Sequence, residues 1–130
     1  MVPTRTDFGL DQIGQISVTA RDLDRAVAFY RDTLGMTFLF RVPGLAFFDC
    51  TGIRLALSTP EGPDFDHPSS VLYFKVADLA AAHATLVRRG VQFIDEPHVI
   101  ATMPDHELWM AFFRDSEGNV MALMSEVREG

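Results

Sequence analysis

The sequence predicts an α+β fold in which one small unit occurs twice, because each half of the chain carries nearly the same pattern of residues. Each copy reads as a strand, a helix and three further strands. The clearest repeat is a hairpin, found as Ala46-Phe47-Phe48 with a turn ending at Gly52, and again as Ala111-Phe112-Phe113 with a turn ending at Gly118. Upstream, Ile16-Ser17-Val18 before Asp22-Leu23 is echoed by Leu72-Tyr73-Phe74 before Asp78-Leu79.

The first copy is expected over about residues 13–58, beginning with a strand at 13–19. Asp22 is a typical helix N-cap, and apolar side chains follow it at helical spacing as far as Gly35, which suits the left-handed end of a helix. Further strands are predicted at 36–41, 45–50 and 53–58, with tight turns between the last three.

The second copy is expected over about residues 71–125, after a linker at 59–70 that is rich in proline and acidic residues. The same reasoning predicts a helix that begins at Asp78 and ends before Gly90. The predicted strands cover 71–76, 91–98, 107–114 and 119–125, and a frayed tail is expected at 126–130. Both copies are expected to share one core, so that residues 1–130 form a single domain.

Composition excludes several classes of function. A chain of 130 residues that is 48% hydrophobic is long enough to bury a core, and its formal charge of −7 disfavours binding to nucleic acid. The single cysteine, Cys50, cannot form an internal disulfide and is expected to be a small buried side chain in a reducing compartment. No apolar stretch approaches the ~20 residues that span a bilayer. We therefore expect a cytoplasmic protein that binds neither membranes nor nucleic acid.

The strand predicted at 107–114 is apolar on both faces, since Leu108, Met110 and Phe112 alternate with Trp109, Ala111 and Phe113. A strand with one face in water would alternate apolar and polar residues. We expect one face to meet a helix and the other to line a pocket.

Several short motifs give the chain a resemblance to a known superfamily. They are Ile13-Gly14-Gln15-Ile16-Ser17-Val18 with Asp22-Leu23, Phe29-Tyr30-Arg31-Asp32 with Leu34-Gly35-Met36, and Phe113-Arg114-Asp115 with Glu117-Gly118-Asn119. In these features the chain resembles the vicinal oxygen chelate superfamily, which includes glyoxalase I, bleomycin-resistance proteins and extradiol dioxygenases. The resemblance implies two tandem βαβββ modules, curved mixed sheets around a cup, and a homodimer.

The resemblance also marks where a metal would bind. In metal-dependent members, one side chain from the first strand and one from the last strand of each module hold a divalent ion. The matching positions here are Gln15, Val71, Ala56 and Ala122, of which only Gln15 has a donor atom. We expect no metal at these positions and no cofactor, as in the bleomycin-binding branch of the superfamily.

These features favour a protein that binds a small organic molecule in an apolar cup. Residues two positions from a metal-equivalent residue share its face of the strand, which places Arg54 and Tyr73 in the cup with Gln15. Ile13, Ser17, Ser58, Val120 and Met124 are placed there by the same rule, although Val120 and Met124 suit packing in the centre of a dimer better.

Two other functions remain open, and whether the chain is an enzyme is undecided. His98 and His106 flank a loop with Asp105 nearby, and an enzyme of lyase, isomerase or dioxygenase type would use them for acid–base chemistry or a non-standard metal site. Their spacing matches no ligand motif, and we favour a surface or hydrogen-bonded role in the loop over such a site. Trp109 suits the core, or the pocket edge as a stacking surface. In the third alternative, a structural or regulatory protein, side chains fill the cup.

Overall fold

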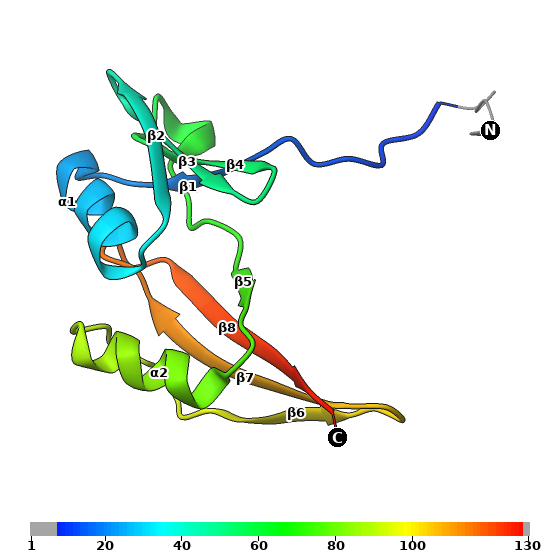
Figure 1. Ribbon diagram of the computed structural model, residues 1–130. Coiled ribbons are helices and arrows are strands. Elements are labelled where there is room, and N and C mark those ends of the chain that lie inside the picture. The colour runs from blue at the N-terminus through cyan, green and yellow to red at the C-terminus, as the bar shows by residue number, and fades with distance from the viewer. Residues whose placement is uncertain (1–7, 129–130) are drawn as a thin grey trace.

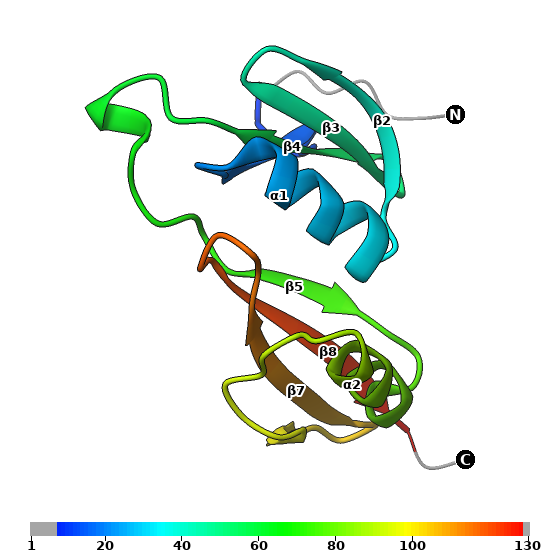
Figure 2. The same ribbon diagram turned by 90° about the vertical axis from the view of Figure 1, so that its left-hand side faces the viewer.

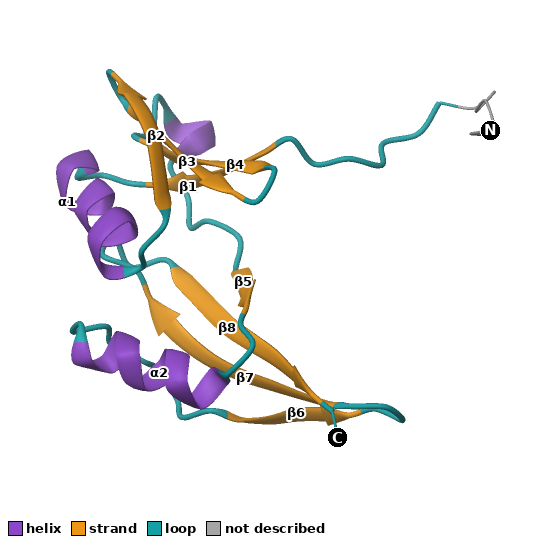
Figure 3. Cartoon of the chain, in the orientation of Figure 1, coloured by secondary structure: helices purple, strands orange, loops and turns teal. Residues whose placement is uncertain are grey.

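The computed structural model describes residues 8–128, which form two four-stranded sheets, each with a helix on one face (Figure 1). Module 1 contains β1 (Gln15–Thr19), α1 (Leu23–Ala28), β2 (Thr37–Val42), β3 (Leu45–Cys50) and β4 (Ile53–Ser58). Module 2 contains β5 (Leu72–Lys75), α2 (Leu79–Arg88), β6 (His98–Thr102), β7 (Glu107–Arg114) and β8 (Val120–Val127). A short 3₁₀ helix, η2 (Pro63–Phe65), interrupts the segment between them. The α+β prediction is confirmed (Figure 3).

The two sheets have the same topology. Their strand orders are β1-β4-β3-β2 and β5-β8-β7-β6, so the first strand of each module lies at a sheet edge, parallel to the last strand. The register is equivalent as well. Ala56 lies between Ser17 and Phe47, and Ala122 lies between Tyr73 and Phe112.

The two helices begin alike but differ in the middle. Asp22 and Asp78 each accept a hydrogen bond from the backbone N–H three residues later, and a glycine with positive φ follows each helix, Gly35 and Gly90. Module 1 has one residue more between its cap and its glycine, and α1 continues as a π-helix, η1 (Phe29–Thr33). A π turn is the usual way for a helix to absorb one extra residue.

One predicted strand is wrong. Residues 91–97 are irregular, with a single bridge between Phe93 and Phe113, and the edge strand β6 begins only at His98. Two groups interrupt the backbone hydrogen bonding between residues 91–97 and β7. The Asp95 carboxylate accepts the Phe112 N–H at 2.7 Å, and Pro97 has no N–H to donate. The other predicted strands are present with ends shifted by up to two residues. The predicted tail at 126–130 instead continues β8 to Val127, and its last two residues lie outside the described chain.

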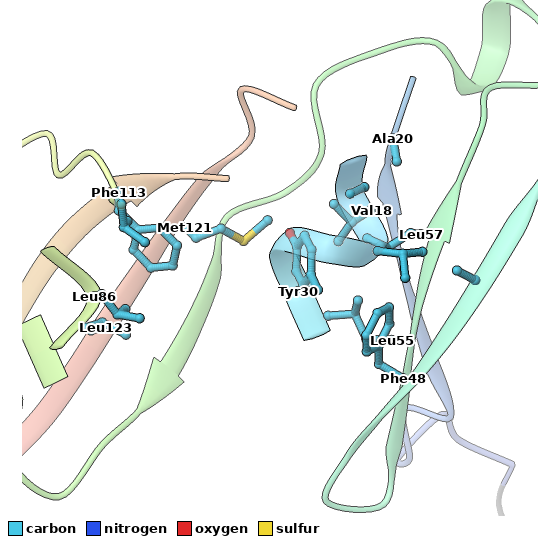
Figure 4. Packing of buried hydrophobic residues seen from close by; sticks show 14 of the residues in the cluster. Val18, Ala20, Tyr30, Phe48, Leu55, Leu57, Leu86, Phe113, Met121 and Leu123 are labelled. Atoms are coloured by element: carbon cyan, nitrogen blue, oxygen red, sulfur yellow. The ribbon is translucent and has the colours of Figure 1, made fainter. Parts of the chain in front are cut away.

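The core is continuous between the modules. α1 packs on β3 and β4, α2 packs on β7 and β8, and both helices lie in front of their sheets in Figure 2. Figure 4 shows Tyr30 between Leu57 of module 1 and Met121 of module 2. Tyr30, Met121 and Phe113 are all fully buried. Cys50, expected to be buried, is partly exposed.

A polar cluster joins α1 and η1 to the β7–β8 turn. The Tyr30 hydroxyl donates to Asp115 at 2.7 Å, and Arg25 donates to Glu117 at 2.8 Å. Burial raises the pKa of Tyr30 far above its ordinary value, and the Asp115 carboxylate raises it further, so the hydroxyl remains a donor. Burial alone would raise the pKa of Glu117, but the hydrogen bonds from Arg25, the Asp22 N–H and Ser116 outweigh it and lower the pKa. This cluster fixes how the modules pack.

Candidate functional site

Each sheet has one face turned away from its helix, and we call these the open faces. Side chains alternate along a strand, so the register assigns residues to each face. The open face of sheet 1 carries Gln15, Ser17, Thr19, Thr37, Phe40, Val42, Leu45, Phe47, Asp49, Arg54, Ala56 and Ser58, with Asp49 directly opposite Arg54. The open face of sheet 2 carries Tyr73, Lys75, His98, Ala101, Leu108, Met110, Phe112, Arg114, Val120, Ala122, Met124 and Glu126.

The open face of sheet 1 holds a fixed positive charge between a polar and an aromatic partner. Arg54 Nε donates to Gln15 Oε1 at 2.9 Å, and the guanidinium carbon lies 5.3 Å from the centre of the Phe47 ring. Phe40 stacks against Phe47 with ring centres 4.7 Å apart. A guanidinium beside an aromatic ring is stabilised by the ring's negative face. The arrangement presents a planar cation next to a planar apolar surface.

A cavity of about 350 Å³ adjoins this face where the linker folds back over it. Ser17 and Ser58 share a hydrogen bond of 2.8 Å between their hydroxyls, and Ser69 Oγ accepts the Thr19 N–H at 2.8 Å. Eight of its ten lining residues are polar: Ser17, Thr19, Leu45, Ser58, Thr59, Glu61, Phe65, His67, Ser69 and Ser70. Sequence reasoning missed the linker residues of this cavity, because no local pattern shows that a proline-rich segment returns to the sheet.

The open face of sheet 2 is mainly apolar. The rings of Tyr73 and Phe112 meet edge to face with centres 6.0 Å apart, on either side of Ala122. Lys75 forms an ion pair with Glu126 at 3.8 Å near the end of β8. Tyr73 is 49% exposed and Val71, just before β5, is 36% exposed. Large apolar side chains are therefore left in water on this side of the chain.

The residues at the metal-equivalent positions do not fit a divalent ion. Gln15, the one side chain with a donor atom, already accepts from Arg54, whose charge would repel a cation. Ala56 and Ala122 are fully buried and offer no ligand atom. Within residues 8–128, no three His, Cys, Asp or Glu side chains come together as a metal-binding group.

The structure does not bring His98 and His106 together. His98 begins β6 opposite Met110, and its Nδ1 lies 2.8 Å from the Glu96 carbonyl oxygen. His106 lies beyond the other end of β6, with its Nδ1 2.7 Å from Asp105. Trp109, predicted as a residue of the binding cup, pairs with Ser125 on the helix side of β7, and its indole N–H donates to Glu107. The odd-numbered positions of β7 point toward α2, and Trp109 is one of them.

Comparison with known families now assigns the chain. The sequence profile of the Glyoxalase/Bleomycin resistance protein/Dioxygenase superfamily matches residues 12–123. The chain belongs to this superfamily, which confirms the resemblance drawn from its motifs and accounts for the tandem βαβββ topology.

The similar proteins differ in what their names state. The antibiotic-binding protein TnmS3 from Streptomyces sp. CB03234 is 26% identical, with a TM-score of 0.75 over 92% of this chain and 99% of that one. A lactoylglutathione lyase from Agrobacterium tumefaciens is 23% identical, with a TM-score of 0.70 over 90% and 95% of the two chains, and shows the shared fold alone. A glyoxylase-like domain-containing protein from Didymella fabae is 26% identical over 86% of this chain and 91% of its own length.

Proposed function

We propose that this protein binds and sequesters a small organic ligand, without a metal ion, between the open face of sheet 1 and the open face of sheet 2. The observation that carries this proposal is the Arg54–Gln15 hydrogen bond, which puts a positive charge where metal-dependent relatives of the superfamily hold a cation. The two alanines on the closing strands, Ala56 and Ala122, add little bulk to either open face, which suits a ligand held between the faces. The antibiotic-binding relative TnmS3, at 26% identity, supports a binding role.

The chemistry of the two faces defines the ligand class. Phe40 and Phe47 offer an apolar surface beside the Arg54 guanidinium, which suits a planar conjugated ring system that carries a carbonyl or phenolate oxygen. The adjoining hydroxyl-lined cavity suits a polar substituent, because Ser and Thr hydroxyls both donate and accept hydrogen bonds. We therefore propose an aromatic metabolite or antibiotic with a polar side group.

We also propose that two copies of the chain complete the site. Phe40 is 45% exposed and Tyr73 is 49% exposed, so each open face leaves aromatic surface in water. Such apolar patches are typical of interfaces. In the proposed homodimer the open face of sheet 1 from one copy covers the open face of sheet 2 from the other, and the ligand lies between them.

Isothermal titration calorimetry with bleomycin and a panel of aromatic antibiotics, in EDTA, tests the binding proposal. At least one compound should bind with micromolar or better affinity, and Arg54→Leu should weaken it about tenfold. Arg41→Leu is the matched control, since Arg41 pairs with Asp24 on the helix side of sheet 1. Stoichiometric binding of Zn²⁺, Ni²⁺ or Mn²⁺ at Gln15 would contradict the metal-free site.

Sedimentation analysis tests the dimer separately. Tyr73→Glu places a charge on the open face of sheet 2 and should convert the dimer to monomers. Val87→Glu, at a similarly exposed position on α2, should leave the dimer intact. A wild-type chain that sediments as a monomer at 50 μM would contradict the shared site.

A further inference from the structure

A second cavity lies on the helix side of sheet 2, at the junction of the two modules, which we call the seam. Its volume is about 360 Å³, within the range of small-molecule sites. Module 1 contributes Leu34 and Met36, from the end of its helical segment, and module 2 contributes α2 and the strand residues Phe74, Phe113 and Leu123. Phe113 pairs with Met121 and lies with Ala111 on the helix side of β7, whereas Phe112 lies on the open face. Sheet 2 itself therefore separates this cavity from its open face.

The lining is apolar except at one place. Nine of its eleven residues are hydrophobic, and the other two are Thr85 and Arg89. Tyr30 fills the space between the modules beside Met121, as Figure 4 shows, and it is not among the residues that line the cavity.

Arg89 is held at the cavity by module 1. Its Nη1 donates to the carbonyl oxygen of Thr33 at 2.9 Å, and this nitrogen would lie 3.9 Å from a Cβ on Gly35. The contact orients the guanidinium and leaves its other N–H groups for a ligand. Within residues 8–128, Arg89 takes part in no ion pair. Among the described residues this cation therefore has no carboxylate partner, although the chain as a whole carries a net charge of −7.

We propose that this seam cavity is a second binding site, for a hydrophobic monocarboxylate. The aliphatic or aromatic body lies among Phe74, Phe113 and Leu123, and the carboxylate pairs with Arg89. A carboxylate matches the planar donor fork of a guanidinium, which makes this the favoured anion at such a position. Because both modules line the cavity, a bound ligand also holds the modules together. This site is independent of the ligand proposed between the open faces.

Titration calorimetry with decanoate, with decanol as the uncharged counterpart, tests the charge requirement. Decanoate should bind at least tenfold more tightly than decanol to the wild-type chain. Arg89→Leu should remove that difference, and Arg88→Leu should keep it, because Arg88 is not among the cavity-lining residues and its guanidinium donates to Thr85. Equal binding of decanoate by wild type and Arg89→Leu would overturn the proposal.

A second pair of variants locates the ligand. Ala81→Trp, at an exposed position in the lining, should fill the cavity and reduce decanoate binding at least tenfold, whereas Ala84→Trp, exposed on α2 outside the lining, should not. Arg54→Leu should leave decanoate binding unchanged and affect only ligands of the open faces. Decanoate binding that is lost in Arg54→Leu but kept in Ala81→Trp would place the ligand on the open face of sheet 1 and refute the seam site.

Discussion

The open faces of the two sheets share a topology and a register but differ in polarity at four matched positions. The repeat pairs Gln15 with Val71, Ser17 with Tyr73, Arg54 with Val120 and Ser58 with Met124. At each of these pairs module 1 has a polar or charged side chain, and module 2 has an apolar or aromatic one. Other matched pairs are alike: Phe47 with Phe112 and Ala56 with Ala122 are identical, Leu45 and Met110 are both apolar, and Asp49 and Arg114 are both charged, with opposite signs. The repeat thus supplies a more polar wall and a more apolar wall on the same scaffold, which suits a ligand with two different sides.

The seam shows a similar asymmetry. Asp115 of module 2 corresponds to Cys50 of module 1, each being the second residue after the buried phenylalanine of its hairpin. Asp115 accepts four hydrogen bonds, from the Tyr30 hydroxyl, the Asn119 side chain, and the backbone N–H groups of Glu117 and Asn119. Cys50 is partly exposed, and no side-chain hydrogen bond from it is found in the described chain. One turn therefore determines module packing and the other does not.

The largest expected effect is the difference in stability between variants of the two matched turn residues, Asp115 and Cys50. Asp115→Ala leaves several buried donors unpaired and should lower the free energy of unfolding by about 3 kcal/mol. Cys50→Ala should lower it by less than about 1 kcal/mol, because it removes only one sulfur atom from a partly exposed site. Urea unfolding followed by circular dichroism measures both. Equal losses for the two variants would show that the seam does not depend on Asp115.

Enlarging the two alanines tests whether both walls hold ligand. Ala56→Leu and Ala122→Leu should each cost about 1–3 kcal/mol of stability through overpacking. Each should also weaken the aromatic ligand found in the calorimetric screen, since the added side chain enters the space between the walls. Ala111→Ser lies on the helix side of β7 beside Leu123 and serves as the control. It should lower stability and leave affinity intact, and loss of affinity there would indicate a general effect of destabilisation.

Exchanging the charge between walls gives a smaller effect. Val120→Arg added to Arg54→Leu moves the cation from the polar wall to the matched position on the apolar wall, directly opposite Arg114. We expect it to recover no more than about half of the roughly 1 kcal/mol lost in Arg54→Leu, because Gln15 and Phe47 orient the original guanidinium. Full recovery in the titration would mean that the charge matters but its partners do not.

The smallest effect concerns pH and the hairpin tip of module 2. Hydrogen bonds from Arg128 and then His106 lower the pKa of Asp105 to about 2. The folded-state pKa lies below the unfolded value of about 4, so this contribution to stability is present above pH 4 and is lost as the pH falls toward 2. Asp105→Asn should make thermal unfolding slightly less dependent on pH in that window. Because Asp105 is exposed, the change in melting temperature should be small. An unchanged pH dependence would show that the pair contributes nothing.

The sequence alone determined what depends on local chemistry. The Asp22 and Asp78 caps, the Gly35 and Gly90 helix ends, and the repeated hairpins follow from propensities and spacing within a few residues, and they specify the tandem fold. The same spacing put Gln15, Arg54 and Ala56 on one face of sheet 1. No membrane-spanning helix was expected, and none of the helices in residues 8–128 is long and apolar enough to be one.

The tertiary structure decided what depends on which side of a strand meets which neighbour. A strand apolar on both faces did not reveal that Trp109 points toward α2 while Met110 faces away, because that choice is set by the register with β8. The Asp95 hydrogen bond that ends the ladder before His98, the contact between Arg54 and Gln15, and the Arg89–Thr33 contact across the seam all join residues far apart in the sequence. The first two exist only after the strands of one module have come together, and the third only after the modules have packed, so no local pattern encodes their geometry.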